Sequence, residues 1–275
     1  MKTARYSLSG ILAMLLLASR LVAQSNLSPS EVLRMLVPQN ERFQFVATPE
    51  GPQSMRVNPA SVAASRGINL HYNLFLDRGK VLEHDISLQN FLFNIAYRRA
   101  LDRSMDYHLN EYTLSLGVGV PEFTAGVSVN WMRSNLPNGS NGMVLNLGIL
   151  IRPIERLSLG AAKSNINQPV LGGVKLLGKN IVGIDLHPFT ETDRLILAVD
   201  AAMPNGGRLK DDVTYKFGAS LLILEGLRIY GVYEKPPVRS TNRVSIGLEL
   251  NIPNVDFSYD ARFDEDKKYE NGVAG

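Results

Sequence analysis

The sequence contains no cysteine. This absence excludes a disulfide framework, a thiolate nucleophile or metal site and, in a mature exported chain, the attachment of lipid to cysteine. No segment has the run of about eighteen apolar residues that a membrane-spanning helix requires. The 275 residues carry a net charge of only +3, so no excess of either sign indicates a nucleic acid or an acidic partner.

Catalytic and metal-binding motifs are also missing. The four histidines are His71, His84, His108 and His187, and they lack the close spacing of a helical metal motif. The sequence has neither a Gly-x-Ser-x-Gly nucleophile elbow nor a phosphate-binding glycine loop. We therefore expect no enzyme activity, no cofactor and no metal site in this segment.

The N-terminus has the order of a secretory signal peptide. Lys2 and Arg5 precede an apolar run, Ile11–Ala18, and Leu21-Val22-Ala23 offers a cleavage site. We predict that residues 1–23 are a signal peptide that is removed, and that the mature protein is exported.

Alternation of apolar and polar residues is the strongest pattern in the chain. In Asp212–Leu222, every second residue from Val213 to Leu221 is apolar, and most of the residues between them are small or polar. Gly226–Glu234, Thr241–Leu250 and Asn254–Phe263 repeat the pattern. Successive side chains of a strand point to opposite faces, so each segment predicts a strand with one apolar and one polar face.

Nine further segments with strand character precede these four. They are Ile68–Asp77, Leu82–Gln89, Phe91–Arg99, Tyr107–Val118, Glu122–Arg133, Met143–Ile151, Arg156–Ser164, Asn180–His187 and Asp193–Ala202. Many approach the length of about nine to eleven residues that a tilted strand needs to cross a bilayer. The sequence therefore predicts an all-β fold, an antiparallel transmembrane β-barrel of about 13–14 strands, with a soluble secreted β-sandwich as an alternative.

The connections favour the barrel because short and long ones alternate. Gly119–Pro121 and Arg152–Glu155 are short, whereas Ser134–Gly142 and Asn165–Lys179 are long and polar. Outer-membrane barrels have short periplasmic turns and longer external loops. The expected location is thus the outer membrane of a Gram-negative type of cell, with lipid as a partner.

Residues 24–66 are expected to hold a short helix and then an irregular stretch, Gln39–Arg66, which is either a plug-like segment in the barrel mouth or a periplasmic lead-in. Ser28-Pro29-Ser30-Glu31 predicts the start of the helix, and Pro38 its end. A barrel over residues 67–263 and a polar tail over 264–275 complete the expected organisation. Thirteen strands are an odd number, whereas bacterial single-chain barrels have an even one, so a strand is missing from the count or lies beyond the sequence.

The alternation of side chains between the two faces of each strand also predicts which of them face the lumen. The charged candidates are Asp185, Asp200, Lys216, Arg228, Glu249, Asp256, Asp260 and Arg262. Mutual salt bridges and a polar permeation path are the two interpretations of this set. The apolar candidates near the plug are Val57, Val62 and Leu92. Aromatic residues near strand ends, either interfacial girdles or ordinary strand residues, are Trp131, Tyr107, Phe123, Phe189, Tyr233 and Phe263.

Three short motifs resemble the long-chain fatty-acid transporter (FadL-type) superfamily of outer-membrane barrels, including its PorV-like branch. Asn58-Pro59-Ala60 is similar to its "NPA" signature before the first strand. Arg152–Gly160 is similar to its proline-marked turn, and Val244–Leu248 is also similar. The resemblance covers roughly residues 42–263 and implies a fourteen-stranded barrel with an N-terminal plug.

The resemblance implies three possible roles. Some members pass hydrophobic molecules through the outer membrane, and the PorV-like branch serves protein secretion and surface attachment. Similar barrels also form the N-terminal part of chains that look like signal-peptide-peptidase (SppA-type) proteases. The expected partners are hydrophobic small molecules or secretion-machinery proteins, and not nucleic acid.

Overall fold

The structure is a computed structural model that describes residues 29–36, 43–48, 54–64, 67–77, 79–104, 106–136, 141–189, 194–209, 211–237, 242–252, 255–264 and 269–274. Within these ranges it gives only the backbone for residues 29–31, 34, 77 and 251–274. The expected signal peptide, residues 1–23, lies outside the described residues.

Fourteen strands form one antiparallel sheet in which each strand pairs with its neighbours along the chain. They are β1 (Asn69–Asp77), β2 (Lys80–Gln89), β3 (Phe93–Leu101), β4 (His108–Val120), β5 (Phe123–Ser134), β6 (Asn141–Ile154), β7 (Leu157–Ser164), β10 (Lys179–Leu186), β11 (Leu195–Pro204), β12 (Thr214–Leu224), β13 (Leu227–Lys235), β14 (Arg243–Ile252), β15 (Val255–Asp264) and β16 (Tyr269–Ala274). A separate hairpin, β8 (Val170–Leu171) and β9 (Val174–Lys175), lies between β7 and β10 along the chain.

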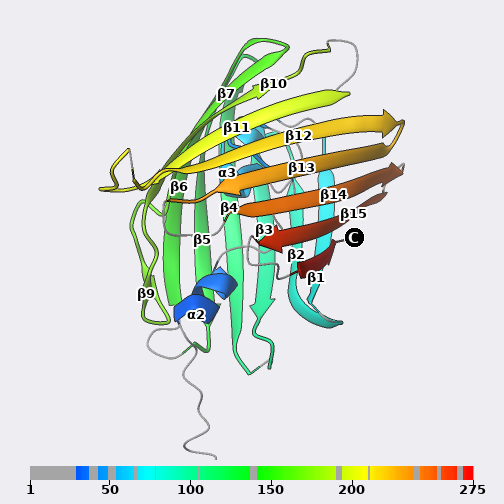
Figure 1. Cartoon of the computed structure of the whole chain (residues 1–275). Helices are drawn as coiled ribbons and strands as arrows, with labels where there is room; N and C mark the ends of the chain where they lie inside the picture. Colours follow the sequence, from blue (N-terminus) through cyan, green and yellow to red (C-terminus); the bar gives the residue numbers. More distant parts are fainter. Residues whose placement is uncertain are drawn as a thin grey trace, which may run out of the picture.

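The sheet curls until its first and last strands approach each other (Figure 1). Cα atoms of β1 and β16 come within 8 Å, although no ladder hydrogen bonds join the two strands. The wall is therefore a barrel with one seam. The predicted all-β antiparallel fold is confirmed. The alternative of a β-sandwich is wrong, because a sandwich needs two facing sheets and these strands form one.

Each of the thirteen expected segments coincides with a strand of the sheet, and two expectations need correction. The segment 264–275, expected to be a polar tail, contains the end of β15 and strand β16. The connection 165–179, expected to be a loop, contains the β8–β9 hairpin. Both were missed because their strands are too short, or too polar, to show clear alternation.

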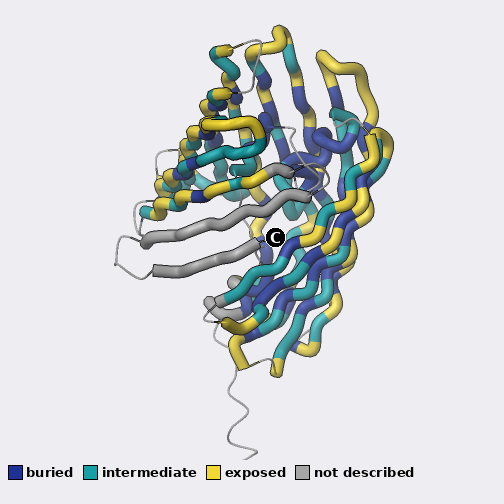
Figure 2. The backbone as a smooth tube through the Cα atoms, turned by 90° about the vertical axis from the view of Figure 1, so that its right-hand side faces the viewer, coloured by how far each residue is buried: buried dark blue, intermediate teal, exposed yellow. Residues whose placement is uncertain are grey.

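The two faces of the sheet differ in the way that period two predicts. Buried and exposed residues alternate along the strands (Figure 2). In β4, for example, Glu111, Thr113 and Ser115 are buried, whereas Tyr112 and Leu116 are 46% and 49% exposed. The polar residues thus face inward and the large apolar ones outward. An outer face of this kind requires an apolar environment.

Within the described residues, three short helices precede the sheet. Helix α2 (Pro29–Leu36) occurs where the capping and proline signals predict it. Helices α3 (Ser54–Val57) and α4 (Ser61–Ala64) lie in a stretch that we expected to be irregular. Four-residue helices are too short to show helical periodicity in sequence. Within the described ranges, every helix falls short of the length and hydrophobicity needed to cross a membrane.

Helix α2 covers the barrel at the end of the long connections, beside β9 (Figure 1). Val32, Met35 and Leu36 pack with buried side chains of β3 to β6 and of the β8–β9 hairpin. Leu171 of β8 is fully buried in this group, which we call the end cap. The inserted hairpin therefore completes an apolar cover at one end of the barrel.

We predict that Leu171→Ala loosens the end cap by about 2–5 kcal/mol, because it leaves a cavity among α2, β8 and the wall. Hydrogen exchange of the α2 amides should become faster by the corresponding factor. The neighbouring Val170→Ala is the matched control, since Val170 is 55% exposed. Equal exchange rates in the two variants would contradict the docking of α2 on this hairpin.

Candidate functional site

The inner face of the barrel holds the N-terminal segment, which we call the plug and define as residues 43–48 and 54–64. Helix α4 contacts β3, β4 and β5, and α3 lies within the curl of the sheet (Figure 1). Glycines on the inner face allow this approach. A Cβ atom at Gly126 would overlap the backbone of Pro59, and one at Gly160 would overlap the backbone of Val46. The plug backbone therefore lies directly against the wall.

Glycines on other strands of the wall also allow the plug to approach closely. An added Cβ atom would meet a plug atom closely at each of these glycines, which are Gly117, Gly126, Gly148, Gly160, Gly183 and Gly218. The sheet register pairs Gly117 with Gly126, Gly126 with Gly148, and Gly160 with Gly183. The glycines therefore form a belt that fits the plug.

Asn58 joins the two parts of the plug to the wall. Its Nδ2 donates to Val46 O (2.7 Å) and to Ile149 O of β6 (3.0 Å), and its Oδ1 accepts from Ala60 N (3.1 Å). Asn58 and Ala60 are buried, and Pro59 lies between them against Gly126. Asn58-Pro59-Ala60 thus forms a close contact between plug and barrel wall.

A buried ionic network holds the opposite side of the plug. Arg98 of β3 is fully buried, and its guanidinium group contacts Glu83 of β2 at 2.8 Å and Glu111 of β4 at 2.7 Å. Its Nη2 also donates to the last carbonyls of α2, Met35 O (3.0 Å) and Leu36 O (3.3 Å). A cation at a helix C-terminus is favourable, so Arg98 binds the end cap to the wall.

The plug contributes its own cation to this network. Arg56 of α3 contacts Asp85 of β2 and Glu111, both at 3.3 Å. Glu111 also accepts from Asn130 Nδ2 (2.6 Å), and Asp85 accepts from Asn73 Nδ2 (3.1 Å). Buried charges are costly unless they are paired and hydrogen-bonded, and this arrangement pairs them across three strands and the plug.

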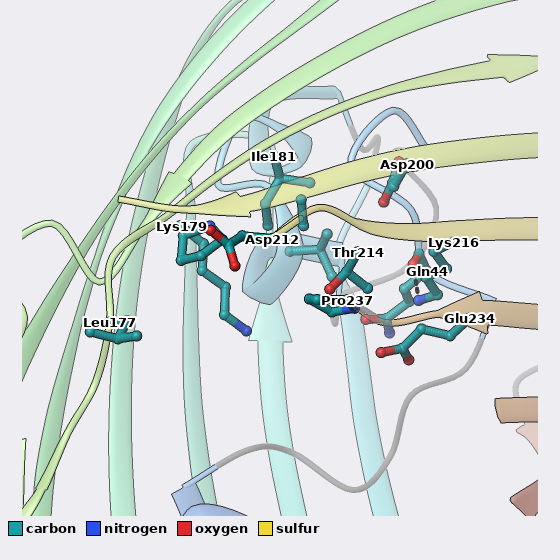
Figure 3. Close-up of a pocket in the computed structure, with 13 residues that line it drawn as sticks. Gln44, Leu177, Lys179, Ile181, Asp200, Asp212, Thr214, Lys216, Glu234 and Pro237 are labelled. Atoms are coloured by element: carbon teal, nitrogen blue, oxygen red, sulfur yellow. Dashed lines mark hydrogen bonds between the residues drawn. The ribbon is translucent and has the colours of Figure 1, made fainter. Parts of the chain in front are cut away.

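A cavity of about 430 Å³ lies between the plug and strands β10 to β13 (Figure 3). It lies toward the long connections, beyond the part of the wall that the plug fills. Its lining residues are Gln44, Val57, Leu177, Lys179, Ile181, Asp200, Ala202, Pro204, Asp212, Thr214, Lys216, Glu234 and Pro237. Apolar surface and several charged groups thus share one partly open pocket.

Two of the expected lumenal charges border this cavity and hold the plug. Lys216 Nζ donates to Gln44 O (2.8 Å; Figure 3), and Asp200 Oδ2 accepts from Val46 N (2.9 Å). The register places Asp200 opposite Lys216, but both side chains engage the plug backbone rather than each other. The second oxygen of Asp200, Oδ1, is buried and has no hydrogen-bond partner among the described residues.

The remaining expected lumenal residues are dispersed. Asp185 is fully buried, and one carboxylate oxygen lies 3.3 Å from His187 Nε2. Arg228 Nη1 donates to Ser220 Oγ at 3.3 Å, and Glu249 is its cross-strand neighbour. Asp256, Asp260 and Arg262 lie in β15, where only the backbone is described.

Some of the apolar and aromatic candidates lie where the sequence predicts, and others do not. Val57 lines the cavity and Val62 is fully buried, but Leu92 is 51% exposed in the turn before β3 and does not face the lumen. Trp131, Phe123, Phe189 and Tyr233 are exposed, as a girdle requires. Tyr107 instead packs against the end cap.

Sequence reasoning missed the buried ionic network and the glycine belt. The alternation along β2, β3 and β4 predicts that four further charged residues face inward, like the expected lumenal charges. They are Glu83, Asp85, Arg98 and Glu111. The belt also had a signal, because several of its glycines stand at polar positions of apolar strands. Among the described residues, no cluster of three or more metal-binding side chains occurs.

Comparisons with known sequences give no family assignment. No protein-family model matches the chain, and no curated protein sequence matches it significantly. The likeness to known proteins is therefore one of structure.

Several solved channel structures share the fold. The CymD monoaromatic hydrocarbon channel is 12% identical, with a TM-score of 0.57 over 83% of this chain and 92% of that one. The Pseudomonas putida toluene transporter TodX is 10% identical, with a TM-score of 0.52 over 84% and 93% of the two chains. At such low identity the likeness shows that the fold is shared.

We predict that Gly148→Ala displaces the Asn58 motif at a cost of about 1–3 kcal/mol, because the new methyl group occupies the space of Asn58 Oδ1. The expected result is faster proteolysis of the plug. Gly231→Ala is the control, because its added Cβ would have no neighbour closer than 4.0 Å. A plug equally protected in both variants would contradict the tight contact.

We also predict that Arg98→Gln destabilises the barrel by about 3–5 kcal/mol, since it leaves two buried carboxylates without their main partner. The urea midpoint of unfolding measures this change. Arg103→Gln, in the exposed connection after β3, should change stability by less than about 0.5 kcal/mol. In Glu83→Gln/Arg98→Gln the two losses should be smaller than additive, and simple additivity would argue against the pairing.

Proposed function

We propose that this chain is a FadL-like outer-membrane barrel that carries small hydrophobic molecules along a plugged lumen. The observation that supports this most directly is the cavity of about 430 Å³ between the plug and β10 to β13. Ligand pockets of about 300–1,000 Å³ are typical of small-molecule sites. The cavity therefore suits a small molecule rather than a protein segment.

The outer face supports a membrane location. Large apolar side chains are exposed around the wall, including Ile95 (53%), Leu147 (50%) and Val182 (57%). In water, so much apolar surface would be unfavourable, at roughly 25 cal/mol per Å². In lipid, the apolar outer surface contacts apolar acyl chains, and the paired strands satisfy the hydrogen bonds of each other's backbone groups.

The cavity lining favours a mainly apolar cargo. Val57, Leu177, Ile181, Ala202 and Pro204 supply apolar surface, and the charged groups stand beside them. The similar structures are a monoaromatic hydrocarbon channel and a toluene transporter, which is consistent with a cargo of one small aromatic ring. We therefore propose monoaromatic hydrocarbons as the first molecules to test.

Passage beyond the cavity requires the plug to move. The contacts that hold it are the Asn58 hydrogen bonds, the Arg56 ion pairs and the bonds from Lys216 and Asp200. The last two border the cavity, so a bound molecule lies next to the bonds that retain residues 44 and 46. Cargo that weakens these two bonds would favour release of that part of the plug.

A matched pair of tryptophan variants tests the cavity. Ala202→Trp fills it from β11, and we expect uptake of toluene into proteoliposomes to fall by roughly tenfold, since access needs the lost volume. Ala201→Trp points outward, beside exposed Tyr215, and should leave uptake unchanged. Equal uptake by both variants would remove the cavity from the route.

The membrane location has a separate test. A folded barrel of this kind should migrate differently on a gel before and after boiling, and it should remain in membranes after a carbonate wash. Identical migration of a verified folded sample would contradict the barrel in the membrane.

The resemblance also raises a secretion scaffold and the anchor of an exported peptidase. Both need a partner or a domain outside the described residues. The mass of the native protein in the outer membrane distinguishes the anchor from the scaffold. A band much larger than the 30.3 kDa of this chain would favour the anchor.

A further inference from the structure

A row of cationic and amide side chains crosses the outer face of the wall near the long connections. The register places His84 of β2 beside Arg99 of β3, Arg99 beside Asn110 of β4, and Asn110 beside Arg133 of β5. Opposed residues of antiparallel strands share a face, so the four side chains lie in line. We call His84, Arg99, Asn110 and Arg133 the outer basic row.

An aromatic row lies directly beneath it. Tyr97, Tyr112 and Trp131 are two residues away on the same three strands and are cross-strand neighbours. Tyr112 and Trp131 are 46% and 43% exposed, and the rings of Tyr97 and Tyr112 lie 5.2 Å apart. Aromatic belts mark the boundary between hydrocarbon and headgroups. The outer basic row therefore lies at the depth of the headgroups.

The donors of this row are not used within the described structure. Neither Arg99 nor Arg133 makes an ion pair with any residue whose placement is described, and Arg99 Nε is buried without a hydrogen-bond partner there. Asn110 Oδ1 accepts from the hydroxyl group of Tyr97 (2.8 Å), which orients the amide of Asn110 in the row. Two guanidinium groups and an amide are thus available side by side.

The outer face of strands β2 to β6 carries no negative charge, and in the adjoining β3–β4 connection Asp102 is buried and Asp106 accepts a hydrogen bond from Ser104 Oγ (3.0 Å). The carboxylates of β2 to β6 are Glu83, Asp85 and Glu111, and all three are buried on the inner face. Outward positions of these strands are otherwise apolar, small or amide-bearing toward the middle of the wall. The outer basic row is therefore a positive site bordered by aromatic surface.

We propose that the outer basic row binds the phosphate group of an anionic lipid in the leaflet at the long-connection end. Guanidinium groups bind phosphate oxygens in a bidentate manner. Arg99 and Arg133 are separated by one strand, so their backbones are about 10 Å apart and their side chains reach one phosphate between them. The acyl chains then lie along the apolar outer face. This inference rests on the proposed membrane location.

The test is a titration of the full-length purified protein in detergent with diphosphoryl lipid A, followed by native mass spectrometry. We expect Arg99→Gln/Arg133→Gln to weaken binding by about tenfold or more, because two charge-assisted contacts are lost. Lys163→Gln/Lys235→Gln removes the same charge from exposed positions on β7 and β13 and should bind like the unchanged protein.

Several outcomes would overturn the proposal. They are equal binding by the two double variants, equal binding of uncharged phosphatidylcholine, or full displacement by inorganic phosphate at matched concentration, which would assign the row to a free anion. The gel shift on boiling is measured on every sample. A normal shift with unchanged lipid binding overturns only this inference, whereas loss of the shift in the unchanged protein overturns the membrane location itself.

Discussion

The plug backbone lies directly against the barrel wall, and this close approach limits where the other parts of the plug can lie. At Gly126, Gly148 and Gly160, any side chain would overlap the plug. Because the plug lies so near, Asn58 bonds Val46 O and Ile149 O at once and connects two plug segments to β6. The volume that remains free, and so the position of the cavity, follows from where this contact holds the plug.

The polar inner face is compatible with a fixed plug because its charges are paired. Arg98 and Arg56 neutralise carboxylates from two strands, β2 and β4, and Arg98 also binds the C-terminal carbonyls of α2. An internal salt-bridge network is weak evidence for stability, but removal of one partner is costly. We infer that the network specifies one position for the plug, through Arg56, and for the end cap, through Arg98.

The asymmetry of the lumen has a related cause. The ionic network lies on β2 to β4, and the plug backbone approaches wall glycines most closely on β4 to β7. On β10 to β13 the plug is held by side chains: Phe45 shares a buried cluster with Ala198 and Tyr230, and Asp200 and Lys216 bond the backbone of residues 46 and 44. The cavity forms on this side, where an apolar surface and a small number of charges meet.

Thirteen strands of the sheet, their two faces and α2 could be predicted from residue patterns, because period-two alternation and helix capping are local properties of the chain. The alternation also identified Asp200 and Lys216 as inward. No local pattern predicts that these two side chains hold the plug rather than each other, or that Glu83, Arg98 and Glu111 meet. Such contacts join residues far apart in sequence through sheet register and curl. β16 was missed for the same reason, since its pairing with β15, and not its own pattern, makes it a strand.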